Sequence, residues 1–93
     1  MTAKSGQKTV TTAGTAEALG SQVINGPLMV KALLANTNNV YIGNDGAGDV
    51  SSSNGLELDA GDSLIFEFVG NLSEIILDVD TNGEGVAWFC LTV

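Results

Sequence analysis

A run of alternating oxygen-bearing residues near the C-terminus is the clearest candidate for chemistry in this sequence of 93 residues. The run Asp78-Val79-Asp80-Thr81-Asn82-Gly83 matches the opening of a calcium-binding loop, where alternate oxygens and a glycine bend wrap a hard cation. The twelfth position, which should be a bidentate glutamate, is Phe89. A hairpin turn flanked by acids gives the same letters. We therefore predict no metal, with calcium at Asp78, Asp80 and Asn82 as the alternative.

Catalysis by paired carboxylates is the second chemistry that these acids suggest. Asp78 and Asp80 share one strand face, and Glu67 is a candidate to lie opposite them, an arrangement that general acid–base catalysis uses. Such catalysis also needs a substrate cleft, but the five aromatic residues are mostly expected in the core. The sequence has no histidine, so the usual nucleophilic triads are excluded. We expect a protein that is not an enzyme and that uses no cofactor.

The charge of the chain excludes further classes of function. Ten of the eleven acidic residues lie in residues 32–93, where there is no base, and the net charge is −8. Nucleic-acid binding needs clustered lysine and arginine, and an anionic membrane surface attracts the same groups, so neither partner is expected. The N-terminus has no apolar stretch typical of a signal peptide, which predicts synthesis in a cytoplasm. Cys90 is the only cysteine and is expected to be a buried apolar group.

The elements that would position these residues begin with a predicted β-hairpin over residues 72–93. Asn82-Gly83 is a strong type I′ turn signal, and a two-residue loop there would pair Val79 with Val86 and Leu77 with Trp88. Cross-strand partners share a sheet face. The predicted core face contains Ile75, Leu77, Val79, Val86, Trp88 and Cys90. The opposite face contains Glu74, Ile76, Asp78 and Asp80 with Gly85, Ala87, Phe89 and Leu91.

Short apolar runs separated by turn signals make up the rest of the chain after residue 26. Residues 28–35 suit a strand covered on both sides, residues 40–42 and 56–58 suit short strands, and residues 43–55 form a polar loop. Residues 64–69 alternate, with Leu64, Phe66 and Phe68 expected inward and Ile65, Glu67 and Val69 outward. Six to seven short strands without a credible amphipathic helix predict an all-β domain, a compact β-sandwich or jelly-roll-like fold over residues 27–93.

Residues 1–26 contain few large apolar groups and are expected to form an N-terminal arm. Such a segment cannot bury enough surface to order by itself, whereas the run Thr9–Thr12 has strand propensity. We predict an arm that is flexible alone and strand-like when docked. The alternative is an ordinary first strand of the sandwich.

Several stretches in this order resemble small virion proteins of tailed bacteriophages, particularly head decoration (cement) proteins. They are Thr11–Ala16, Val30–Asn36, Val40–Asn44 and Leu56–Leu64. The resemblance implies a β-sandwich or β-tulip domain, often trimeric, that binds the major capsid protein on the outer surface of the mature head and stabilises it without catalysis. It also implies assembly in the host cytoplasm and an arm that adds a strand to the coat protein. The arm residues expected to contact the capsid are Lys4, Lys8, Thr9, Val10, Thr11 and Thr12.

The surface between subunits of a homotrimer is expected on the mixed face of the predicted hairpin and beside it. Its predicted residues are Ile65, Val69, Ile76, Phe89 and Leu91. The alternative is that these residues pack against the other sheet of the same domain. Two other functions remain open: a receptor- or glycan-binding tip module of a tail or head fibre that uses the 43–55 loop, and a calcium-dependent adhesive module.

Overall fold

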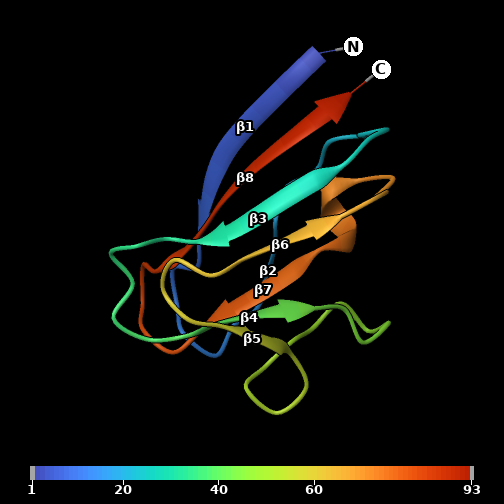
Figure 1. Cartoon of the computed structure of the whole chain (residues 1–93). Coiled ribbons are helices and arrows are strands. Elements are labelled where there is room, and N and C mark those ends of the chain that lie inside the picture. Colours follow the sequence, from blue (N-terminus) through green and yellow to red (C-terminus); the bar gives the residue numbers. More distant parts are fainter. Residues whose placement is uncertain (1, 93) are drawn as a thin grey trace.

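The computed structural model describes residues 2–92 and confirms an all-β sandwich of two four-stranded antiparallel sheets (Figure 1). The first sheet has the order β1-β8-β3-β6, with β1 (Thr2–Thr9), β8 (Gly85–Thr92), β3 (Leu28–Ala32) and β6 (Ser63–Phe66). The second sheet has the order β2-β7-β4-β5, with β2 (Glu17–Ala18), β7 (Ile76–Val79), β4 (Val40–Gly43) and β5 (Leu56–Leu58). One turn of 3-10 helix, η1 (Leu72–Glu74), precedes β7. Within residues 2–92, no helix has the length and apolar character that crossing a membrane requires.

The core lies between the two sheets and follows from strand alternation. In β3 the side chains of Leu28, Val30 and Ala32 are buried while Met29 and Lys31 point outward, because successive side chains of a strand face opposite sides. The β8 residues Val86 and Cys90 are buried on the same inner side, as predicted. The largest fully buried side chains are Val10, Ile24, Leu28, Val30, Val40, Leu72, Leu77, Val86 and Cys90.

The predicted hairpin over residues 72–93 is wrong, because β7 and β8 belong to different sheets. Gly83 has a positive φ of 82°, but Asn82 does not, so the type I′ turn that would pair the two strands is absent. The Gly83 amide donates instead to the carbonyl of Val10, and the Asn82 side chain accepts from Ala13. The chain therefore crosses from one sheet to the other here. The predicted core face survives this change, because Val79 and Val86 both point into the space between the sheets.

The N-terminal residues take the second of the two alternatives, an ordinary first strand of the sandwich. β1 pairs along its whole length with β8, from Thr2 opposite Thr92 to Thr9 opposite Gly85. Figure 1 shows the two strands side by side, with the start of β1 and the end of β8 at the same end of the sandwich. Further along, Val10, Leu19 and Ile24 are buried in the core. The predicted boundary at residue 26 therefore coincides with no change of structure.

Two local predictions fail where a strand ends earlier than the apolar pattern suggests. β6 stops at Phe66, and the chain then bends, so that Phe68 is 70% exposed and Val69 is buried, the reverse of the prediction. β3 stops at Ala32, and Leu34 is 75% exposed. The prediction that this strand is covered on both sides is also wrong, because nothing in the described chain lies over Met29, which is 41% exposed.

Candidate docking surface

Three large apolar side chains form a row across the outer face of the first sheet. Met29 of β3 lies between Phe89 of β8 and Ile65 of β6 in the strand registers. Because directly opposed residues share a face, the three side chains project together from the sheet. Their exposed fractions are 41% for Met29, 51% for Phe89 and 67% for Ile65. Scattered exposed apolar residues are ordinary, but adjacent ones on a flat sheet are typical of a contact surface.

We call this surface the bare face and define it by the outward positions of the four strands. They are Ala3, Ser5, Gln7 and Thr9 of β1, Gly85, Ala87, Phe89 and Leu91 of β8, Met29 and Lys31 of β3, and Ser63 and Ile65 of β6. None of these positions carries a carboxylate, although the chain has eleven acidic residues, and Lys31 is the single charged member. The bare face is thus the part of an acidic protein where a partner meets no negative charge.

A shallow groove of about 410 Å³ runs over the bare face between two cross-strand rows. One row contains Ser5, Phe89 and Met29, and the other contains Gln7, Ala87 and Lys31. The small side chain of Ala87, which lines the groove, leaves space beside the phenyl ring. The groove could therefore receive an apolar side chain of a partner.

The residues predicted for a subunit interface are divided by the structure. Phe89 and Ile65 lie on the bare face with the half-buried Leu91, whereas Val69 is in the core and Ile76 is buried in the second sheet. Met29 belongs to the row but was absent from the predicted set. Sequence alternation separates Met29 from Leu28 and Val30, but only the strand order places it between Phe89 and Ile65.

The outer face of the second sheet, which we call the covered face, is closed by two loops of the same chain. Tyr41 of β4 and Ile76 of β7 are buried there under Val50 from the 44–55 loop, with Ala16 and Ala18 packed against them. Gly55 allows this loop to lie close, because a Cβ at that position would stand 2.7 Å from the Tyr41 Cβ and 2.8 Å from a Val50 methyl group. This small second core accounts for the burial of Ile76.

The three candidate calcium ligands lie near the covered face, and each accepts a hydrogen bond from this chain through one side-chain oxygen. The Asp78 side chain, in a residue only 3% exposed, accepts through Oδ1 from the backbone amides of Gly14 at 3.0 Å and Val79 at 2.8 Å. Asp80 accepts from the Tyr41 hydroxyl at 2.8 Å, a bond that raises the pKa of the tyrosine. Among residues 2–92, no group of three or more acidic, histidine or cysteine side chains is arranged to hold a metal ion.

A polar hollow of about 300 Å³ opens beside these carboxylates. Its lining includes Asp78 and Asp80, the side of Tyr41, and Ser51 and Ser52 of the predicted binding loop. Carboxylates, hydroxyls and an aromatic ring are the groups that bind a hydroxyl-rich ligand.

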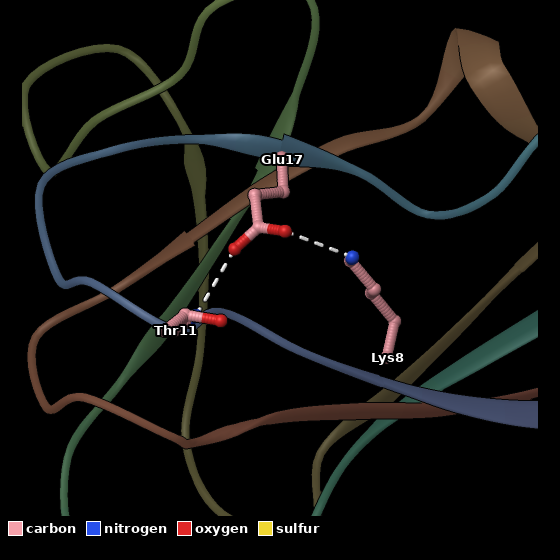
Figure 2. A network of polar contacts seen from close by, with 3 residues as sticks. All are labelled: Lys8, Thr11 and Glu17. Atoms are coloured by element: carbon pink, nitrogen blue, oxygen red, sulfur yellow. Dashed lines mark hydrogen bonds and ion pairs between the residues drawn. The ribbon is translucent and has the colours of Figure 1, made fainter.

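Half of the six residues predicted to contact a capsid through the arm are engaged within the sandwich through their side chains or a loop amide. Lys8 Nζ lies 2.9 Å from Glu17 Oε1 and joins β1 of the first sheet to β2 of the second, and Thr11 donates its amide to the other carboxylate oxygen at 3.0 Å (Figure 2). These two bonds lower the pKa of Glu17. Val10 is fully buried, whereas Lys4, Thr9 and Thr12 retain exposed surface.

No protein-family model matches this sequence, and no curated protein is significantly similar to it.

Proposed function

We propose that this chain is a non-catalytic decoration protein that binds the outer surface of a tailed-phage head through its bare face. The observation that carries the proposal is the row of Phe89, Met29 and Ile65 on a sheet face without a carboxylate. Covering these side chains would remove apolar surface from water, which favours association by about 25 cal/mol for each Å² buried. The sequence resemblance to head decoration proteins supplies the partner, the major capsid protein.

The size of the bare face argues for several copies acting together. Four strands spaced by about 4.8 Å, with about five residues each at about 3.4 Å, give a footprint of roughly 300–400 Å². A stable protein–protein interface buries about 800 Å² on each partner, so one bare face alone would bind weakly. A homotrimer that contacts neighbouring coat subunits would bind far more tightly, because the second and third contacts become intramolecular.

A glycan-binding tip module of a phage fibre is the second candidate function, and the polar hollow on the other side of the molecule favours it. The hollow combines the Asp78 and Asp80 carboxylates with Ser52 and Tyr41, next to the 43–55 loop predicted for this role. A sugar there would donate its hydroxyl hydrogens to the acids. Head binding through the bare face and glycan binding through the hollow use different residues, so variants separate them.

Co-sedimentation with phage heads that lack this protein tests the decoration proposal. The wild type should pellet with the heads, and Phe89→Ser should reduce the bound fraction at least tenfold at equal concentration. Phe68→Ser is the matched control, because Phe68 is also exposed but does not belong to the bare face, and it should pellet like the wild type. Equal binding by Phe89→Ser and the wild type would contradict the proposal. So would a failure of the wild type and Phe68→Ser to pellet with the heads.

A further inference from the structure

Alternate residues of β1, from Ala3 to Thr9, direct backbone groups to the outer edge of the first sheet, where no strand of residues 2–92 pairs with them. Gly85 and Leu91 of β8 bond to the side of the sheet where β3 lies. The Gly85 carbonyl accepts from the Leu33 amide, and the Leu91 amide donates to the Pro27 carbonyl. In an antiparallel ladder, alternate residues bond to opposite sides, so the even positions of β8 bond to β1. The Val10 amide, which donates to the Glu84 carbonyl at 2.9 Å, continues this pattern. The remaining β1 residues, Ala3, Ser5, Gln7 and Thr9, therefore direct their N–H and C=O groups to the free edge.

This free edge is long compared with the other three edges of the sandwich. β1 has eight residues, whereas the edge strands β2, β5 and β6 have two, three and four. Figure 1 shows β1 at the outside of the first sheet along its full length. A long unpaired edge is a template for another strand, and proteins usually blunt such edges with a proline, a bulge or a charge. Here β1 contains neither proline nor positive-φ glycine.

Two lysines are the charged groups of this edge. Lys4 and Lys8 lie on the inner side of β1, opposite Cys90 and Val86 of β8. Lys8 forms the ion pair with Glu17, the one such pair among the described residues, so Lys4 has no acidic partner there. An incoming strand would place its inward side chains beside Lys4. Acidic side chains are favoured at that position, and a second β1 strand, which brings two more lysines to the same side, is disfavoured.

The groove of the bare face adjoins the same edge. Ser5 and Gln7 of β1 form its wall, and Phe89, Ala87 and Met29 lie behind them. The outward side chains of an added strand would lie beside Ser5 and Gln7 on the same face, and would continue the cross-strand row of Ser5, Phe89, Met29 and Ile65. Strand addition obtains affinity from main-chain bonds and specificity from pockets for alternate side chains.

We propose that the free edge of β1 binds an extended segment of another protein by strand addition, with acidic residues facing Lys4 and apolar residues facing the groove. The required pattern is an alternation of acidic and apolar residues over about six positions. The inference is independent of the proposed function, because it specifies the chemistry of the segment and not the particle that contains it.

Titration of the full chain with synthetic peptides tests this proposal. An eight-residue peptide that alternates glutamate with valine should bind and shift the amide resonances of Ser5 and Gln7, and a peptide that alternates lysine with valine should bind more weakly. Gln7→Pro removes one outward N–H without removing a bond to β8, and its ring blocks the approach of a strand. Gln7→Thr is the matched control that retains the amide.

The expected result is at least a tenfold loss of affinity for the acidic peptide in Gln7→Pro and none in Gln7→Thr. Lys4→Glu should weaken the acidic peptide and strengthen the basic one, by about two- to fivefold each, since cross-strand charge pairs are individually modest. No shift at millimolar peptide, or equal binding by Gln7→Pro, would overturn the proposal. A wild-type dimer that Gln7→Pro makes monomeric would also overturn it, since the edge would then be occupied by a second copy.

Discussion

The two outer faces of the sandwich differ in what lies over them. On the covered face, Ile76 and Tyr41 are buried within the chain, where Val50, Ala16 and Ala18 pack against them. On the bare face, Phe89, Met29 and Ile65 keep about half of their surface exposed. Both faces have apolar side chains on similar strands, so composition does not separate them. The difference is that segments of the same chain cover the apolar side chains of one sheet, whereas those of the other sheet are exposed.

The largest expected effect is the contrast between the isoleucines of the two faces. Ile76→Ala should destabilise the protein by about 2–4 kcal/mol, because it leaves a cavity under the loops. Ile65→Ala should change the free energy of unfolding by less than about 0.5 kcal/mol, because that side chain is mostly in water. Urea denaturation followed by Trp88 fluorescence measures both. Ile76→Val replaces the alanine variant if that variant does not fold, and equal effects at both positions would remove the distinction between the faces.

A smaller effect should follow from lifting the loop off the covered face. In Gly55→Ala the new methyl group would meet the Tyr41 Cβ, Val50 and the Ser51 carbonyl, and this overpacking should cost about 1–3 kcal/mol. Gly70→Ala is the control, since a Cβ there meets nothing within 4 Å. Thermal unfolding of the two variants gives the comparison. A Gly55→Ala protein as stable as Gly70→Ala would show that the loop does not seal this face.

The smallest expected effect concerns pH and the ion pair that joins the two sheets. The folded protein holds the pKa of Glu17 below its ordinary value of 4.5, so its carboxylate stabilises the fold fully above that pH, and this contribution is lost as pH falls through the lowered pKa. Glu17→Gln should therefore be less stable than the wild type at pH 7, and the difference should shrink by pH 3. Urea denaturation at both pH values measures it. A difference that is the same at both would contradict the role of the charge.

How far the sequence predicts this molecule depends on whether a feature is local. The alternation in residues 64–66 predicted the inward Leu64 and Phe66 and the outward Ile65 correctly, because side-chain direction in a strand is a local property. The Asn82-Gly83 signal failed, because turn propensity does not specify which sheet the next strand joins, and long-range bonds to Val10 and Ala13 decided it. Ile76 was assigned to a contact surface, since its burial depends on a loop that ends more than twenty positions earlier in the sequence. The bare face was half predicted, through Phe89 and Ile65, because knowing that Met29 lies between them requires the strand order.

Radical footprinting of the protein on the assembled particle tests the central claim most directly. Hydroxyl radicals oxidise exposed methionine and phenylalanine side chains, and mass spectrometry compares the rates for free and head-bound protein. The account predicts that Met29 and Phe89 become protected on the head, while Phe68, exposed but outside the bare face, oxidises at an unchanged rate. If Met29 and Phe89 oxidise as fast on the particle as in solution, the bare face is not the docking surface.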